Sequence, residues 1–419
     1  MTSDSRDNAP RFGPRMMRRL DRLATHSDDP DRLTRTYLGA AQKKAHEDVL
    51  GWMREAGMTA RLDAVGNVVG RYEGAQPGAP ALLLGSHLDT VRDAGRYDGM
   101  LGVIAGIECV EALGRAGKRL PFAVEVIGFA DEEGVRFPVN FIGSRAVIGT
   151  LDGAALAAKD AAGTSMAEAL RAAGFDPARV GQAARKPSEV LAYVELHIEQ
   201  GPVLEAGGLA LGVVDAIAGS TRLSVELTGE AGHAGTVPMK ARRDALATAA
   251  ECVLAVERRA SAPGLVGTVG RIECLPGAIN VIPGKVRFSV DLRSGDDGLR
   301  KAAIADVERE FAAIAARRKV GLAISTIHDG KACACSPWLM ERIGRAIESQ
   351  GQKRFDLPSG AGHDGMTMIG LCDIGMMFVR CKHGVSHNPA EAMTMDDAEI
   401  ATRALLRLIE EFEPGSRRT

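Results

Sequence analysis

The chain has 419 residues, of which 45% are hydrophobic and 25% charged, a composition ordinary for a globular protein of two or three domains. With 52 Lys and Arg against 54 Asp and Glu, the formal charge is −2, which gives no reason to expect a nucleic acid or an anionic membrane as a partner. The sequence has no apolar run long enough for a membrane helix, no signal-peptide core and no C-x-x-C pair among its seven cysteines, so we expect a cytoplasmic protein.

Helical and strand-like segments alternate along much of the chain. From about Leu20 to Gly57 the apolar residues follow a helical period, and a further helical stretch covers residues 103–117. Segments 81–85, 122–130 and 375–380 are apolar almost throughout, as strands buried on both faces are. The alternation predicts an α/β fold with a large, mostly parallel sheet.

The pattern changes near Val213–Gly219. The following strand-like segments alternate polar and apolar residues, and helices are expected over about 243–260 and 298–317. This pattern is typical of an antiparallel sheet with helices on one face. We therefore expect an α+β domain over residues 216–328, inserted into a larger domain formed by residues 1–215 and 329–419.

Side chains of the kinds that bind metals follow the predicted strands of the larger domain. They are His87 with Asp89, the run Asp131–Glu133, His197, and His383 with His387, while Asp98 lies in a glycine-flanked loop that opens the next helix. In open α/β sheets, ligands bind outside the carboxyl ends of the strands. The sequence therefore predicts that these groups converge on one crevice.

The ligand types favour particular ions. Imidazoles combined with carboxylates suit Zn²⁺ or Mn²⁺, and also Co²⁺ or Ni²⁺, better than Mg²⁺ or Ca²⁺. Three histidines with two or three carboxylates exceed the needs of one tetrahedral ion, so we expect two divalent ions per subunit. The adjacent Glu132 and Glu133 suit a division in which one carboxylate binds metal and the other takes a proton from water.

Ten segments, in order and spread over most of the chain, resemble the hydantoinase/carbamoylase branch of amidases, within the superfamily of dinuclear metallopeptidases and aminoacylases. They are GSHLDT, DAGRYDGMLGV, FADEEGVRF, GSRA, VELHIEQGPVLE, GHAGTVPM, INVIPG, DLRS, SGAGHDGM and GVSHNPAE. One such segment would be a weak signal, but the ordered set is specific.

The resemblance implies roles for individual residues of the larger domain. It implies that one ion is held by His87, Asp98 and His197, and the other by Asp98, Glu133 and His387. It also implies that Glu132 is the general base, and that Asp89 orients His87 through a hydrogen bond.

For the inserted domain, the resemblance implies a ferredoxin-like dimerisation or lid domain and a homodimer. His233 would then reach the partner's site and stabilise an oxyanion. Asn280 and Arg293 would grip the substrate carboxylate, with Gln200 and the backbone at Gly360 as further substrate contacts. The residues alone leave open that Arg293 makes a surface ion pair and that Asn280 is a turn residue.

These roles together predict hydrolysis of the ureido (N-carbamoyl) group of a small carboxylate, with release of ammonia and carbon dioxide. We expect allantoate as the substrate, and N-carbamoyl-L-amino acids are the alternative. An aminoacylase or dipeptidase is less favoured, because such relatives usually carry an acidic ligand where His197 stands. A non-catalytic metal-binding homologue is disfavoured by the presence of Glu132.

The remaining histidines carry weaker expectations. We expect His383 to lie outside the metal site, since only the segment around His387 fits the resemblance. His363 and Asp364 are left open between a loop-structuring role and a place in the substrate pocket. His26, His46 and His328 are expected at the surface.

Overall fold

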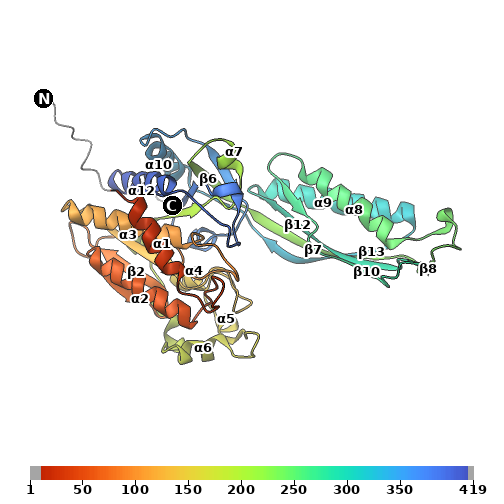
Figure 1. Cartoon of the computed structure of the whole chain (residues 1–419), viewed down its shortest axis with the longest axis horizontal. Helices are drawn as coiled ribbons and strands as arrows, with labels where there is room; N and C mark the ends of the chain where they lie inside the picture. Colours follow the sequence, from red (N-terminus) through yellow and green to blue (C-terminus); the bar gives the residue numbers. More distant parts are fainter. Residues whose placement is uncertain (1–10, 414–419) are drawn as a thin grey trace. The chain divides into compact units, whose positions relative to one another are not determined.

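The computed structural model of the protein describes residues 11–413, and the chain divides into two compact units (Figure 1). Within the described residues, the first unit comprises the chain up to Asp215, Cys335–Leu357, and the chain from His363 onward. The second unit comprises Ala216–Ala334 and Pro358–Gly362, so it runs past His328, where the sequence placed its end, and takes in a short later segment.

The first unit is built on a mixed sheet in the order β1-β2-β4-β3-β5-β16-β6-β14, with β15 also pairing with β6. The strands of this sheet are β1 (Thr59–Leu62), β2 (Val68–Tyr72), β3 (Ala81–His87), β4 (Ala123–Phe129), β5 (Val190–Ile198), β6 (Leu211–Ile217), β14 (Cys333–Ala334), β15 (Asp356–Ser359) and β16 (Ile374–Val379). Of these, β14 falls within the second unit, and β6 and β15 each end in it. The ladders β4–β3, β3–β5 and β5–β16 are parallel, whereas β2 pairs antiparallel with β4, and β6 pairs antiparallel with β16. The predicted α/β class is confirmed, but the sheet is parallel only at its centre.

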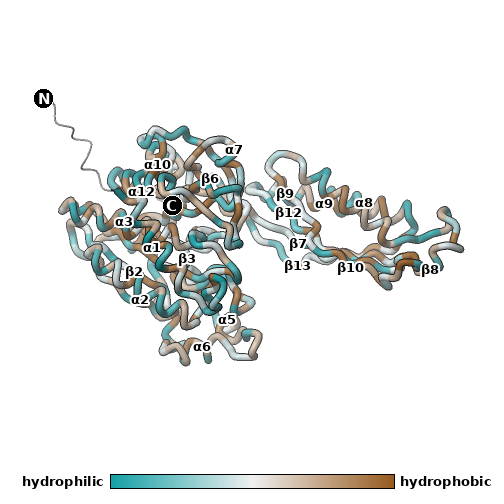
Figure 2. The backbone as a smooth tube through the Cα atoms, viewed as in Figure 1, coloured by the Kyte–Doolittle hydropathy of each residue, from teal (hydrophilic) through white to brown (hydrophobic). Residues whose placement is uncertain are grey.

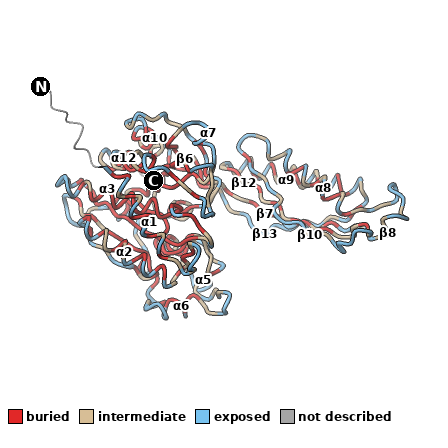
Figure 3. The backbone as a smooth tube through the Cα atoms, in the orientation of Figure 1, coloured by how far each residue is buried: buried red, intermediate tan, exposed pale blue. Residues whose placement is uncertain are grey.

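Helices cover both faces of this sheet. The helices of the first unit are α1 (Gly13–Ala24), α2 (Ala40–Glu55), α3 (Met100–Arg115), α4 (Ile142–Val147), α5 (Gly153–Ala157), α6 (Met166–Ala172), α7 (Val203–Ala206), α10 (Pro337–Glu348), α11 (Gly365–Met368) and α12 (Met395–Glu410). α1, α3, α10 and α12 pack together in the main hydrophobic core, and α4 and α6 pack in a separate cluster. Strands β3, β4 and β16 are buried along their whole length because they are covered on both sides. In Figure 3 the interior of this unit is accordingly mostly red.

The second unit has an antiparallel sheet in the order β10-β12-β7-β13, with β9 beside β12 and a separate β8–β11 pair. Its elements are β7 (Gly219–Thr228), β8 (Gly232–His233), α8 (Ala245–Ala260), β9 (Val266–Thr268), β10 (Ile272–Leu275), β11 (Val281–Ile282), β12 (Lys285–Ser294), α9 (Asp297–Arg318) and β13 (Gly321–Gly330). Buried and more exposed residues alternate along β7 and β12, whose apolar face packs with α8 and α9 in one core.

Two expectations near the N-terminus are wrong. The helical stretch from Leu20 to Gly57 is two helices, α1 and α2, separated by the irregular segment 25–39. His26 and His46 are not at the surface: they are 7% and 6% exposed, because His26 contacts Asp48 and His46 faces the core from α2. His328 is exposed as expected. Between residues 11 and 413, no helix has the length and apolar character needed to span a bilayer.

Candidate metal centre

The parallel strands at the centre of the first unit bring the predicted ligands to one edge of the sheet. His87 ends β3, and its register partner Phe129 ends β4 just before the run Asp131–Glu133. His197 lies near the end of β5 opposite Phe378 of β16. Neighbouring parallel strands end at the same edge, which explains the convergence of groups that lie far apart in the sequence.

Asp98 lies at the centre of the cluster and is 3% exposed. Its Oδ1 atom is 3.4 Å from His87 Nε2 and 3.1 Å from His197 Nε2. Its Oδ2 atom is 3.2 Å from His387 Nε2, which in turn is 3.4 Å from Glu133 Oε1. Asp98 therefore touches both groups of residues that the sequence assigns to separate ions, with one oxygen toward each.

These separations fit the spacing of ligands around metal ions. Two ligands bound to one tetrahedral Zn²⁺ at 2.0–2.1 Å lie roughly 3.3 Å from each other. The groups His87, Asp98, His197 and Asp98, Glu133, His387 each have ligand atoms within 4.8 Å of one another. Moreover, the buried Oδ1 of Asp98 accepts no hydrogen bond from the part of the chain that the structure describes. The residues present thus suit a divalent ion in each group.

Hydrogen bonds on the far side of two imidazoles orient them. Nδ1 of His87 is 3.1 Å from the carbonyl oxygen of Asp89, and Nδ1 of His197 is 2.9 Å from that of Ile198. If each Nδ1 carries the proton and donates it to the carbonyl, each Nε2 has a lone pair on the Asp98 side of its ring, and that of His197 also accepts a hydrogen bond from the N–H of Gly99 (3.2 Å).

The Asp89 carboxylate does more than the sequence suggested. Its Oδ1 atom is 3.4 Å from His87 Nδ1, in line with the expected contact. In addition, Oδ1 accepts a hydrogen bond from the backbone N–H of Glu132 (3.0 Å), and Oδ2 accepts one from the N–H of Glu133 (3.2 Å). One buried carboxylate thus fixes the peptide that carries both glutamates.

Burial controls the electrostatics of the cluster. It raises the pKa of Glu132 well above its ordinary value, an effect that Glu133 strengthens and His87 opposes. Burial also raises the pKa of Glu133, to about 7. For Asp98, burial alone would raise the pKa, but His197, His387 and His87, when protonated, face its oxygens and hold the pKa well below its usual range. Asp98 is therefore held as a carboxylate, whereas Glu132 can carry a proton.

Gln200 and the remaining histidines are placed differently with respect to this cluster. Gln200 Nε2 donates a hydrogen bond to Asp98 Oδ2 (2.9 Å), so Gln200 lies directly at the centre. His383 is 73% exposed and lies 3.5 Å from Glu205, outside all the candidate groups. His363 is buried with its ring 4.5 Å from that of His197, and Asp364 next to it is fully buried.

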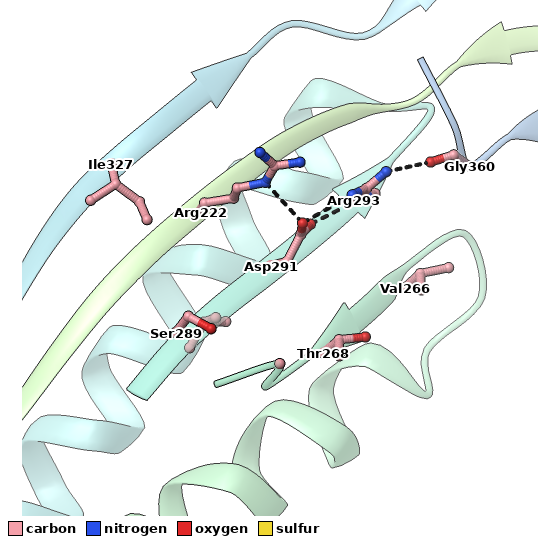
Figure 4. Close-up of a pocket in the computed structure, with 10 residues that line it drawn as sticks. Arg222, Val266, Thr268, Ser289, Asp291, Arg293, Ile327 and Gly360 are labelled. Atoms are coloured by element: carbon pink, nitrogen blue, oxygen red, sulfur yellow. Dashed lines mark hydrogen bonds and ion pairs between the residues drawn. The ribbon is translucent and has the colours of Figure 1, made fainter. Parts of the chain in front are cut away.

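The residues predicted in the second unit fall in two places. His233 and Asn280 are exposed neighbours, since Val281 pairs with His233 and the N–H of Ala234 donates to the carbonyl of Asn280 (2.9 Å). Arg293 lies instead in a pocket of about 540 Å³ that Gly360 also lines (Figure 4). There Arg293 Nη1 donates to the carbonyl of Gly360 (2.9 Å).

The guanidinium of Arg293 already faces one carboxylate. Nε and Nη2 donate to Oδ1 and Oδ2 of Asp291, each at 3.0 Å, and Arg222 Nε donates to the same carboxylate (Figure 4). The edge of the Arg293 guanidinium formed by Nε and Nη2 is therefore occupied by Asp291 of the same unit. The other edge of the guanidinium is formed by Nη1 and Nη2.

Several residues that support the centre were missed by the sequence reasoning. Arg35 is fully buried and donates from Nε to the carbonyl of Leu88 (2.6 Å), between His87 and Asp89. Glu391 accepts hydrogen bonds from the backbone of the Asp98 loop. The only signal for Glu391 was its place in GVSHNPAE, and none pointed to Arg35.

With this geometry in view, residues 83–411 match the model of peptidase family M20/M25/M40. This chain belongs to that family. The matched range begins in β3 and ends just past α12, so it includes every residue of the metal cluster.

Within the M20/M25/M40 family, the similarity extends over nearly the whole chain. An N-carbamoyl-L-amino acid amidohydrolase of Geobacillus stearothermophilus is 43% identical over 96% of this chain and 99% of that protein. A probable allantoate deiminase of Oryza sativa subsp. japonica is 42% identical over 94% of this chain and 87% of its own length. A solved amidase of the hydantoinase/carbamoylase family from Burkholderia multivorans superposes with a TM-score of 0.89 at 33% identity, covering 95% of this chain and 97% of that one.

Proposed function

We propose that this protein is a divalent-metal amidohydrolase that cleaves the ureido group of a small carboxylic acid, releasing ammonia and carbon dioxide. The observation that carries the proposal is the buried Glu132 beside a histidine–carboxylate cluster with the spacing of metal ligands. The relatives named for N-carbamoyl amino acids and allantoate support the substrate class.

His87, Asp98 and His197 would hold one ion, and Asp98, Glu133 and His387 the other, with Asp98 shared. Zn²⁺ and Mn²⁺ suit this donor set best, and Co²⁺ or Ni²⁺ would also fit. When bound, such ions polarise a carbonyl group and make water a better nucleophile at neutral pH.

Glu132 is the proposed general base. Its burial favours the protonated form, so once it has taken a proton from water it can hold that proton and pass it to the leaving nitrogen. The hydrogen bonds from Glu132 and Glu133 to Asp89 fix the peptide and hence the direction of both side chains. Gln200, which contacts Asp98, is a proposed substrate contact.

The second unit is the proposed lid and dimerisation domain, with a ferredoxin-like fold, and it supplies the groups that grip the substrate. Arg293 and the backbone at Gly360 would bind the carboxylate, with Asn280 as a second contact and His233 stabilising the oxyanion. His233 and Asn280 lie beyond the Lys285 end of β12, whereas Arg293 lies near its other end. Eight residues of strand span about 26 Å, which is too far for one small substrate to bridge.

It follows that, if both places contact one substrate, they come from different copies of the chain. We therefore propose a homodimer in which His233 and Asn280 reach the partner's site. Large exposed apolar side chains near that end of the second unit support an interface there: Met239, Ile272, Leu275 and Ile279 are all exposed. The tube is largely brown, the hydrophobic colour, beside the labels β10 and β8 in Figure 2.

Allantoate is the proposed substrate, and N-carbamoyl-L-amino acids are the second candidate because relatives of both names match this chain, at 42% and 43% identity respectively. The test is ammonia release by Mn²⁺-loaded protein from allantoate, from a panel of N-carbamoyl-L-amino acids and from N-acetyl-L-amino acids. We expect turnover of allantoate, and no turnover of the N-acetyl compounds by an enzyme specific for ureido groups.

The variant Glu132→Gln keeps the size of the side chain but cannot accept a proton. We expect its kcat to fall by roughly 10²–10⁴-fold, the usual contribution of a general base, with its metal content unchanged. A preference for carbamoyl amino acids would assign the second substrate class. Inactivity on every ureido compound, or full activity of Glu132→Gln, would refute the proposed mechanism.

A further inference from the structure

We propose that Glu391 is a positioning residue that connects, by hydrogen bonds, the loop that carries Asp98 to the segment that carries His387. It thereby sets the affinity of the centre for its divalent ions. The inference rests on the metal sites proposed above, and it assigns a role to a residue that binds neither ion. It is carried by the hydrogen bonds of one buried carboxylate to two ligand-bearing segments that are far apart in the sequence.

The first contact of Glu391 is with the backbone of the Asp98 loop. Glu391 is 4% exposed, and its Oε1 atom accepts hydrogen bonds from the N–H groups of Tyr97 (2.9 Å) and Asp98 (3.1 Å). Because one of these donors belongs to Asp98 itself, Glu391 fixes the peptide from which the shared carboxylate projects.

The second contact is with the segment that carries His387. Oε2 of Glu391 is 3.0 Å from the hydroxyl of Ser386, the residue before His387. The same hydroxyl lies 3.0 Å from Asp98 Oδ2, the oxygen that faces His387. A serine hydroxyl has a single proton, so it can donate to only one of these carboxylates at a time.

Packing holds the carboxylate against the loop. A methyl group added at Gly95 would lie 2.3 Å from Cβ and Cδ of Glu391, so the chain passes directly over this side chain. The side chain of Glu391 is tightly packed and shielded from water. A shorter side chain at this position must therefore either shift the Asp98 loop or leave the buried N–H groups of Tyr97 and Asp98 without an acceptor.

Two substitutions separate hydrogen bonding from charge. Glu391→Gln removes the charge but keeps an oxygen for the two N–H groups, and its amide can donate to Ser386, whose proton then turns to Asp98. Glu391→Asp keeps the charge but shortens the side chain by one methylene. Both are milder than truncation to alanine, which empties a buried polar site.

The measurement is Mn²⁺ affinity and stoichiometry of the full-length protein without substrate, from the electron paramagnetic resonance signal of free Mn²⁺ and by calorimetry. We expect Glu391→Asp to weaken Mn²⁺ binding by about 10–100-fold, as is usual for residues that orient metal ligands, and Glu391→Gln to bind like the wild type. Glu108→Gln is the destabilised control, because Glu108 is also buried but pairs with Arg15 and Arg19 away from both loops. It should lower the melting temperature and leave Mn²⁺ affinity unchanged.

Equal Mn²⁺ affinity in the wild type and both Glu391 variants would overturn the proposal. So would weak binding by Glu391→Gln with normal binding by Glu391→Asp, since charge rather than hydrogen bonding would then be responsible. Because Mn²⁺ binding is read without substrate, the result is independent of whether the protein hydrolyses any ureido compound.

Discussion

His46 is an imidazole held inside the first unit on the inner face of α2. Burial, helped by the nearby Arg35 guanidinium, lowers its pKa from 6.5 to about 3. In the unfolded chain the same group titrates near pH 6.5, so between these values the unfolded state binds a proton that the folded state does not. Through His46 alone, the free energy of unfolding should therefore fall by about 1.4 kcal/mol between pH 7.5 and pH 5.5.

Urea unfolding at these two pH values measures this loss. His46→Leu has no titrating group at this site. Between pH 7.5 and pH 5.5, its free energy of unfolding should therefore fall less than that of the wild type, by about 1.4 kcal/mol. His328→Leu, at an exposed position of the second unit, is the matched control and should keep the wild-type difference. An unaltered pH dependence in His46→Leu would show that His46 is not the responsible group.

At the scale of elements, helix α3 lies unusually close to the strands that carry the predicted ligands. A Cβ at Gly102 would lie 2.3 Å from the carbonyl oxygen of Leu196 and 3.0 Å from Cβ of Ser86. These residues immediately precede His197 and His87. Gly102→Ala should therefore destabilise the protein by about 1–3 kcal/mol through overpacking, although alanine favours helix.

Gly51→Ala in α2 is the control for the helical effect. No atom lies within 4 Å of a Cβ built at Gly51, so the same substitution there should stabilise the protein by roughly 0.5–1 kcal/mol. Thermal unfolding of the two variants should give shifts of opposite sign. A Gly102→Ala protein as stable as the wild type would mean that α3 can move away from β3 and β5 at little cost.

The same packing explains which elements could be predicted from the sequence. β3, β4 and β16 are apolar along their length because both faces are covered, and this left a clear signal at 81–85, 122–130 and 375–380. The gathering of His87, Asp98 and His197 followed from parallel strands that end at one edge. The break between α1 and α2 was missed because apolar residues continue to anchor the connecting segment, as the buried Tyr37 does.

Supporting residues were harder to predict for a physical reason. Arg35 and Glu391 act by hydrogen bonds to the backbone of distant segments, and such bonds depend on tertiary position rather than on any period in the sequence. The contacts from Asp89 to the N–H groups of Glu132 and Glu133 were missed for the same reason.

At the scale of the whole molecule, the proposed homodimer makes each site depend on two chains. Glu132 would come from one subunit and His233 from the other, so a variant lacking either group should be inactive when it is assembled alone. In a mixed dimer of Glu132→Gln and His233→Ala, one site receives both intact residues and the other receives neither. Mixing the two inactive proteins should therefore restore activity.

The amount restored follows from two-fold symmetry. Random exchange of equal amounts gives half mixed dimers, and half of their sites are intact, so we expect about one quarter of the wild-type activity. Differently tagged subunits, purified together after exchange, verify that mixed dimers have formed. If these verified mixed dimers stay inactive, His233 serves the site of its own chain. If sedimentation finds monomers with full activity, the assignment of His233 to a partner's site fails altogether.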